Sequence, residues 1–368
     1  DEAAADAAIA LAKDASKTVS VVYAVPRTDV AAAAEGAKAA ANLAIALRGE
    51  QAAESLFVLP TEANAYGARD MGVDPQRAPG RVDASTPGMA FGEMVDAANA
   101  GALKAMIVVG DNPLMFAPDR ARVEQALAAL DLLIVIADEM TDTAKMARVV
   151  LADVPAYAKT GTFTSGDRRV SRLHAAMPAL GDARPALLAL TDLAGAIGDA
   201  GMWSYAHPDA VTDEIAERVP GYEAYRAGFG RWSKTRASGE VTKGERQPVA
   251  DVTVAVAPGS MVLTTTRTLF TSLEGAEIHS PEADKLHREE FVEIHPADAV
   301  GLRVNDEDTL TLVTDRGELE IRCKISGRVL EGVLHIPQYY DGGAVMRLLG
   351  ADGRPAAAQV RVAATAAG

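Results

Sequence analysis

Residues 131–170 read DLLIVIADEMTDTAKMARVVLADVPAYAKTGTFTSGDRRV, and this stretch decides the fold class. It holds two apolar runs of strand length, DLLIVIA and ARVVLADV. Between them lies a polar segment whose Asp and Thr residues suit the start of a helix. A strand, a helix and a second strand form a βαβ unit, in which the two strands run parallel. The stretch therefore predicts a parallel sheet with helices on both faces.

The same alternation extends outward over residues 1–200. We expect strands at 18–25, 55–60 and 102–110 and helices at 28–47, 91–101, 119–130 and 184–198. Residues 1–200 are thus predicted to form a Rossmann-like α/β domain. Because the chain opens on Asp1 with an Ala-rich, helix-like stretch, we expect this domain to be incomplete at its N-terminus.

Beyond residue 248 the pattern becomes almost entirely β. The predicted strands are DVTVAVA (251–257), MVLTTTRTL (261–269), FVEIH (291–295), DTLTLVTD (308–315), GELEIRCKIS (317–326) and GVLHIPQYY (332–340). Short strands at this density favour a closed barrel, because closure removes exposed edges. We therefore predict a six-stranded barrel domain over 248–368, and we interpret 201–247 as a connecting segment that packs on its neighbours.

Charge and composition exclude several classes of function. The net charge is −15 and the acidic residues are spread along the chain, so nucleic acid is not an expected partner. No apolar run approaches the ~20 residues that cross a bilayer, so we expect no direct membrane insertion. Cys323 is the single cysteine, so this chain cannot hold an iron–sulfur cluster by itself. Its alternating surroundings predict an inert strand residue, and no histidines are grouped with the spacing of metal ligands.

Three polar clusters could bind a ligand, because each follows a predicted strand or forms a loop with phosphate-binding residue types. The candidate binding residues are Gly110, Asp111, Asn112, Asp138, Thr141, Thr143 and Arg168. Each cluster also has a structural interpretation. The first could be a generic turn, the second could cap a helix, and the third could be a surface loop held by Asp–Arg pairs.

The order and spacing of these clusters closely resemble the molybdopterin oxidoreductase family. The shared motifs are a G-x-N-P turn (110–113), Asp and Thr residues after a strand (138–144), Ala-Asp-Val (152–154) and Gly-Thr-Phe followed by Arg-Arg (161–169). The stretches 291–320 and 328–340 are similar to the pterin-binding module at the C-terminus of that family. This resemblance implies that the barrel is of the double-psi type, and that the candidate residues would line one nucleotide arm of a molybdopterin guanine dinucleotide.

One stretch departs from the pattern of active family members, which carry a Gly-Thr-rich turn with arginines near the start of the barrel module. Here residues 264–290 place carboxylates at Glu274, Glu277, Glu282 and Asp284. A carboxylate beside a phosphate lowers affinity by like-charge repulsion. We therefore expect no bound pterin and no catalytic residues in this portion.

The same stretch and EANAYGARDMG (62–72) resemble a cofactor-free branch of the family, the large iron–sulfur (G) subunit of complex I type NADH–quinone oxidoreductases. This implies a structural scaffold in the peripheral electron-transfer arm, on the cytoplasmic side of a membrane. The expected partners are the other subunits and an N-terminal iron–sulfur region of the same or a separate chain. The alternatives are the cofactor-binding C-terminal half of a molybdenum or tungsten bis-pterin enzyme such as formate dehydrogenase, and a free-standing nucleotide-binding module.

Overall fold

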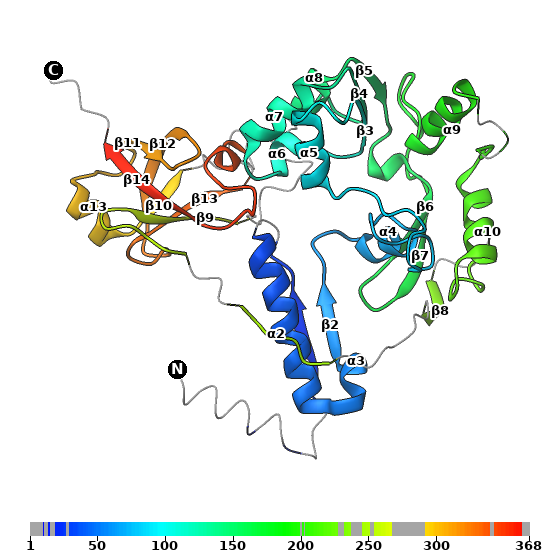
Figure 1. The fold of residues 1–368 in the computed structure, drawn as a ribbon, viewed down its shortest axis with the longest axis horizontal. Helices are drawn as coiled ribbons and strands as arrows, with labels where there is room; N and C mark the ends of the chain where they lie inside the picture. The colour runs from blue at the N-terminus through cyan, green and yellow to red at the C-terminus, as the bar shows by residue number, and fades with distance from the viewer. Residues whose placement is uncertain are drawn as a thin grey trace.

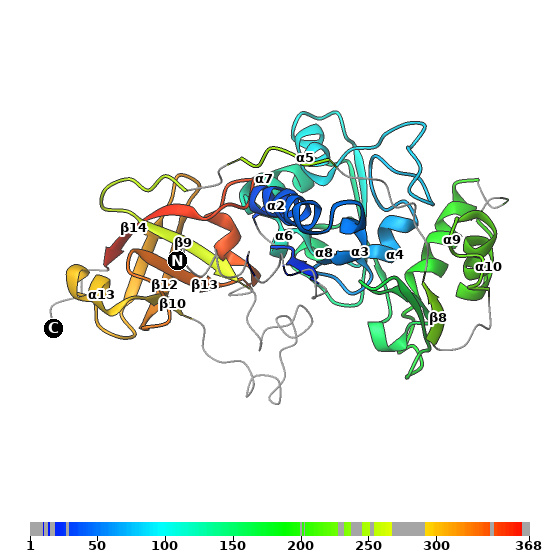
Figure 2. The same cartoon turned by 90° about the horizontal axis from the view of Figure 1, so that it is seen from below.

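The computed structural model describes residues 10, 14, 19–26, 29–198, 201, 203–226, 232–236, 245–250, 254–266, 291–338 and 342–362. The barrel strands β9–β14 lie at one end of an elongated molecule, and the helices α9 and α10 lie at the other (Figures 1 and 2). The described helices are α2 (Val30–Arg48), α3 (Ala52–Ser55), α4 (Ala65–Asp70), α5 (Phe91–Asn99), α6 (Pro113–Phe116), α7 (Arg120–Ala128), α8 (Asp142–Met146), α9 (Ala186–Ala196), α10 (Pro208–Arg218) and α13 (Pro296–Leu302), with 3-10 turns η1 (Gly49–Gln51), η2 (Ala156–Ala158) and η4 (Ala344–Arg347).

The predicted parallel strands are confirmed, but they belong to two sheets. Strands β1 (Val21–Ala24) and β2 (Leu56–Leu59) pair parallel beside α2. Strands β3 (Ala105–Val109), β4 (Leu132–Ala137) and β5 (Val149–Ala152) form a second parallel sheet in that order. The alternation of strands and helices fixes the direction of each strand, whereas the sheet that a strand joins depends on tertiary packing.

The main core of the α/β domain lies between the second sheet and the helices α5 and α7. Val108 and Val135 from the strands pack there with Val95 of α5 and Val123 of α7, all buried. On the opposite face, Ile107 and Val109 of the edge strand β3 are exposed, whereas Ile136 of the central strand is 0% exposed.

A third sheet forms where a loop was predicted. Strands β6 (Gly161–Thr164) and β7 (Arg169–Leu173) form an antiparallel hairpin, and β8 (Trp232–Arg236) joins β7 on its other edge. The hairpin was not predicted because its small and hydroxyl-bearing residues resemble those of a loop. The connecting segment contains the unpredicted helix α10, whose N-terminus carries Pro208 at its first position. Tyr222 and Tyr225 of that segment pack against Val170 of the hairpin.

The barrel is closed and six-stranded, as predicted. Its strands are β9 (Met261–Thr266), β10 (Val292–Ile294), β11 (Thr309–Val313), β12 (Glu318–Ile325), β13 (Val333–Pro337) and β14 (Ala356–Val362), in the order β10-β12-β11-β14-β9-β13. The pairs β10–β12 and β9–β13 are parallel and the other four are antiparallel, which is the mixed pairing of a double-psi type barrel.

One predicted barrel strand is wrong. Residues 254–257 of DVTVAVA form no strand, and residues 251–253 lie outside the described part of the chain. The sixth strand is β14, AAAQVRV, whose alanines have low β-propensity and gave no strand signal. Tertiary pairing to β11 and β9 on either side overrides that local preference.

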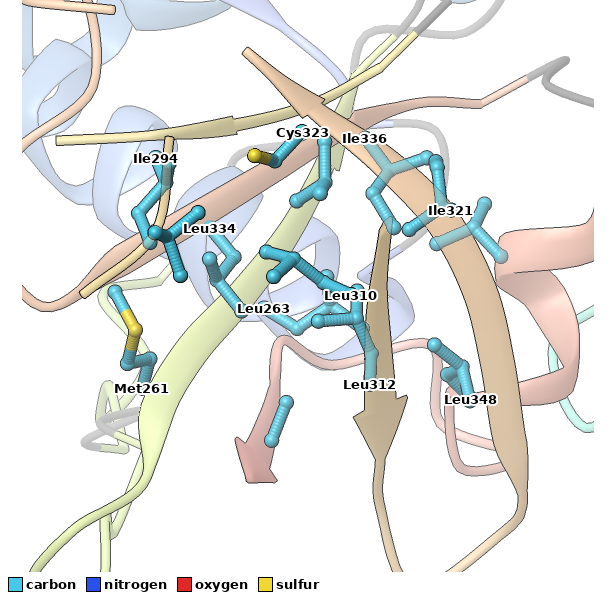
Figure 3. Close-up of a cluster of buried hydrophobic side chains, with 14 of the residues drawn as sticks. Met261, Leu263, Ile294, Leu310, Leu312, Ile321, Cys323, Leu334, Ile336 and Leu348 are labelled. Atoms are coloured by element: carbon cyan, nitrogen blue, oxygen red, sulfur yellow. The ribbon is translucent and has the colours of Figure 1, made fainter. Parts of the chain in front are cut away.

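Alternate residues of the barrel strands fill its interior. Leu263, Leu310, Leu312, Leu334 and Ile336 are each 0% exposed. Figure 3 shows these side chains converging, together with Cys323 of β12, whose thiol points into the same cluster. The strand position predicted for Cys323 is confirmed.

Candidate functional site

The candidate site lies where β3 and β4 end, because the first two clusters follow these neighbouring strands. Gly110 ends β3 with φ 63°, and its N–H donates to the carbonyl of Ile136 in β4 at 2.8 Å. A positive φ is the conformation that glycine adopts most readily, so the turn that follows can leave the sheet sharply. The carboxyl ends of parallel strands are where α/β sheets bind ligands.

Asn112 and Thr143 join the first cluster to the second. The Thr143 hydroxyl donates to Oδ1 of Asn112 at 2.7 Å, and the backbone N–H of Leu114 donates to the same hydroxyl oxygen at 3.3 Å. Thr143 is 0% exposed and Asn112 5%. The hydrogen-bonding groups of this pair are thus used inside the protein, where an unmade bond would be costly.

Thr141 caps α8, as the structural interpretation predicts, because its side-chain oxygen accepts from the N–H of Ala144 at 3.1 Å. Asp111 accepts from the N–H of Asn112 at 2.8 Å. Asp111 and Asp138 are exposed at the strand ends. The groups of this cluster that face solvent are therefore Gly110 and two carboxylates.

Arg168 belongs to a second cluster. Its guanidinium pairs with the buried carboxylate of Asp70 at 2.7 Å and lies 5.4 Å from the ring centre of Tyr66. Arg81 also pairs with Asp70, and the Tyr222 hydroxyl donates to the Asp70 carboxylate at 2.6 Å. Burial, followed by the Asp70 carboxylate, raises the pKa of Tyr222 above its usual value. The Asp–Arg pairs expected for this segment are present, and Arg169 pairs with Asp167 at 3.0 Å, but the segment is a β-hairpin and not a surface loop.

One residue that sequence reasoning missed is Arg120, which joins the α/β domain to the barrel. Its guanidinium donates to the carbonyl of Gly342 at 2.8 Å, to Asp142 at 2.9 Å and to Glu124 at 2.8 Å. Its side chain is 7% exposed. Burial disfavours the charged forms of Arg120 and Asp142, but the combined hydrogen bonds and charges outweigh it. Hydrogen bonds and charges from Glu124 and Asp142 raise the pKa of Arg120. Hydrogen bonds and charges from Arg120 and Lys145 lower the pKa of Asp142.

Backbone contacts close the same junction. The N–H of Asp119 donates to the carbonyl of Leu349 at 3.1 Å. Gly343 has φ 80°, and a Cβ there would collide with the backbone of Met115. The pair Gly342–Gly343 was the available sequence signal, since two adjacent glycines indicate close backbone approach.

The barrel contributes a polar group of its own. Gln338 follows β13, is 1% exposed, and neither its Nε2 nor its Oε1 has a hydrogen-bond partner among the described residues. Such orphaned buried amides are rare, and a ligand or water can satisfy them. The carboxylates Glu274, Glu277, Glu282 and Asp284 lie outside the described residues. No described group of three or more His, Cys, Asp or Glu side chains is placed to hold a metal ion.

Several polar side chains in the α/β half of the site make bonds within the protein. Asn112 and Thr143 satisfy each other, Thr141 caps a helix, and Arg168 is held by Asp70. The solvent-facing side chains are carboxylates, which repel phosphate. Gln338, in contrast, leaves polar atoms for a ligand on the barrel side.

Known proteins match both domains. Residues 14–196 match the molybdopterin oxidoreductase family, and residues 261–366 match the molydopterin dinucleotide binding domain. The chain belongs to the molybdopterin oxidoreductase family. Acetylene hydratase from Pelobacter acetylenicus shares the fold, with a TM-score of 0.61 and 15% identity over 82% of this chain and 51% of that one.

Relatives within the family have different functions. The chain is 32% identical to NADPH-Fe(3+) oxidoreductase subunit alpha of Geobacter sulfurreducens, over 87% of this chain and 38% of that protein. It is 30% identical to the G 2 subunit of NADH-quinone oxidoreductase from Rhizobium meliloti, over 78% and 35%. It is 26% identical to F420-dependent formate dehydrogenase subunit alpha of Methanocaldococcus jannaschii, over 88% and 54%. The chain therefore spans between 35% and 54% of these relatives.

Proposed function

We propose that this chain is a structural scaffold within a complex I type NADH–quinone oxidoreductase and that it works without a bound pterin. The observation that carries the proposal is the buried Asn112–Thr143 pair, which uses the polar side chains of the candidate site to join its two turns. A site that binds a dinucleotide needs those groups free to meet it. The similarity to the G 2 subunit of the Rhizobium meliloti NADH-quinone oxidoreductase supports this assignment.

The junction between the two domains supports the proposed scaffold function. Arg120 holds the loop at Gly342 and the helix α8 together through buried, charge-assisted hydrogen bonds. This junction fixes the barrel relative to the α/β sheets, so that one chain can present both to neighbouring subunits. We propose these neighbours to be an iron–sulfur region and other subunits of a peripheral arm at the cytoplasmic side of a membrane. No described helix is long and apolar enough to cross a bilayer.

Elemental analysis of the purified assembly tests the proposal. We expect iron from neighbouring clusters, with molybdenum and tungsten far below one atom per chain. A parallel extraction with fluorescence detection of oxidised pterin should give no stoichiometric product. One molybdenum or tungsten atom per chain together with extractable pterin would refute the scaffold function.

A second candidate is the cofactor-binding half of a bis-pterin oxidoreductase related to formate dehydrogenases. The orphaned amide of Gln338 favours it, because this side chain offers polar atoms to a ligand. The test is Asp138→Ala in the assembled enzyme, with Asp131→Ala as its control. Asp131 is also exposed, and it lies beside the opposite end of β4. Loss of formate oxidation for Asp138→Ala alone would favour this candidate, and equal activity of both variants would count against it.

A further inference from the structure

Three polar side chains form a row on the outer wall of the barrel, across the neighbouring strands β9, β13 and β10. Leu334 of β13 points into the barrel (Figure 3), so its neighbour His335 points outward. In the register of the sheet, His335 lies beside Glu293 of β10. On its other side, the ring of His335 meets the hydroxyl of Thr266, the last residue of β9. The row thus contains a hydroxyl, an imidazole and a carboxylate, in that order.

The geometry of the row sets the direction in which a proton can move. Oγ1 of Thr266 lies 2.8 Å from Nε2 of His335, and Oε2 of Glu293 lies 3.7 Å from Nδ1 of the same ring. A carboxylate beside Nδ1 favours the tautomer that carries its hydrogen there. Nε2 then holds the lone pair and accepts from the Thr266 hydroxyl. A nucleophile, a base and a group that orients the base form the arrangement that activates a hydroxyl for covalent chemistry.

The surroundings of the row suit these functions. Thr266 is exposed, so a reactant can reach its hydroxyl, whereas the side chain of His335 is 19% exposed and that of Glu293 25%. Burial lowers the pKa of His335 and outweighs the opposite effect of the Glu293 charge. The ring is therefore neutral at neutral pH, which is the form that can take a proton. Thr264 on the same face differs, because its hydroxyl donates to the carbonyl of Leu334 at 3.0 Å and meets no base.

The charges around the ring indicate which kind of reactant fits. Glu293 is the charged group beside His335 on β10, and the exposed Lys324 of β12 lies on the far side of Glu293 in the register. The described residues of β9 and β13 that point outward beside the ring are uncharged, namely Thr264, Thr266, Val333 and Pro337. A carboxylate repels a phosphoryl group, whereas an uncharged acyl group meets no such repulsion.

We propose that Thr266 is a nucleophile that accepts a short acyl group from an activated carboxylic ester or thioester, with His335 as its base and Glu293 as the positioning residue. Oγ1 of Thr266 bonds to the carbonyl carbon while its proton passes to Nε2 of His335. The bond from the carbonyl carbon to the leaving oxygen or sulfur then breaks, and His335 gives the proton to the leaving group. The products are acylated Thr266 and a free alcohol or thiol.

Acetylation by p-nitrophenyl acetate tests the proposal on the full chain. Peptide mass spectrometry locates the acetyl group, and the release of nitrophenolate gives the rate. We expect an acetyl group on Thr266, formed at least about tenfold faster than in His335→Gln, because a positioned base contributes roughly 10²–10⁴-fold. Thr266→Ser keeps a hydroxyl and should also be acetylated at this position. The matched controls Thr264→Val and His295→Gln should leave the rate at Thr266 unchanged, since His295 is an exposed histidine that caps α13.

The pH profile separates a base from a merely structural histidine. The rate at Thr266 should rise as His335 loses its proton, with a midpoint below the usual histidine value of about 6.5. Glu293→Gln removes the charge that raises the pKa of His335, so it should move the midpoint lower still. This variant also keeps the test open if His335→Gln fails to fold, which circular dichroism shows.

Three results would overturn the proposal. They are the absence of an acetyl group on Thr266 in the folded chain, an equal rate in a folded His335→Gln variant, and a midpoint that Glu293→Gln leaves in place. The proposed activity does not depend on the scaffold function. Because the acetylation test measures neither metal nor pterin, either proposal can fail alone.

Discussion

The buried carboxylate of Asp70 gives the sharpest test of the physical argument. Asp70→Asn keeps the size of the side chain and removes its charge. It leaves the guanidinium of Arg168, whose side chain is 20% exposed, without the carboxylate that it meets at 2.7 Å. Removing one partner of a buried ion pair costs about 3–5 kcal/mol. Arg81 adds at most about 1 kcal/mol, because its side chain is 44% exposed and water screens the pair.

These contributions are not additive, and the remaining exposure of Arg168 lets water reach it. We therefore expect a total loss of about 3–4 kcal/mol in the free energy of unfolding of the α/β domain. For a domain of this size each kcal/mol lowers the melting temperature by about 2–4 °C, so the midpoint should fall by roughly 6–16 °C.

Thermal unfolding followed by circular dichroism measures this shift. The control is Asp74→Asn, because Asp74 pairs with the exposed Arg69 at 3.9 Å and should change stability by less than about 0.5 kcal/mol. If Asp70→Asn melts within about 2 °C of the control, the cluster contributes no more than a surface ion pair, and the reasoning from burial is refuted.

Three further predictions concern the site, the junction and the thiol. Asn112→Ala should destabilise the fold by about 1–3 kcal/mol, because the buried hydroxyl of Thr143 loses its acceptor. The double variant with Thr143→Ala should lose less than the sum of the two single losses. Urea unfolding of the unchanged chain, the two single variants and the double variant checks this. Because the pKa of Asp142 is lowered in the folded state, its contribution is present above the unfolded value near 4 and is lost as the pH falls through the folded value. Limited proteolysis should therefore release the barrel more readily below about pH 4, and Asp142→Asn should abolish that pH dependence while weakening the contact with Arg120 at neutral pH; an unchanged acid profile would contradict this. Burial raises the pKa of the Cys323 thiol, so it should resist a thiol reagent at pH 8 in the native chain and react at once in guanidinium.

Several strands could be predicted because their residues are apolar along the whole strand. The runs around β3, β4 and β5 are continuous and apolar, so their existence and direction followed from local pattern alone. The strand β14 could not be predicted in the same way. Its alanines carry no strand preference, and its conformation comes from two neighbours that lie far away in the sequence.

The candidate site shows the same division. Asn112 and Thr143 could be chosen as candidates because each follows a predicted parallel strand, and in the structure their side chains form a hydrogen bond. The hydrogen bond between them depends on the depth and orientation of the two side chains, which no local pattern encodes. Asp70 gave no signal at all, since its partners Arg168 and Tyr222 come from remote segments.

The order of strands in the barrel has a consequence for synthesis and quality control. The strand β14 lies between β11 and β9, so the ring cannot close until Val362 has been made. Until then both neighbours present unpaired backbone edges, which are templates for association with other chains. A nascent or truncated chain would expose the unpaired edges of β9 and β11 while residues 1–200 are already synthesised. Chains that end before this strand are therefore expected to associate with one another rather than remain as single molecules.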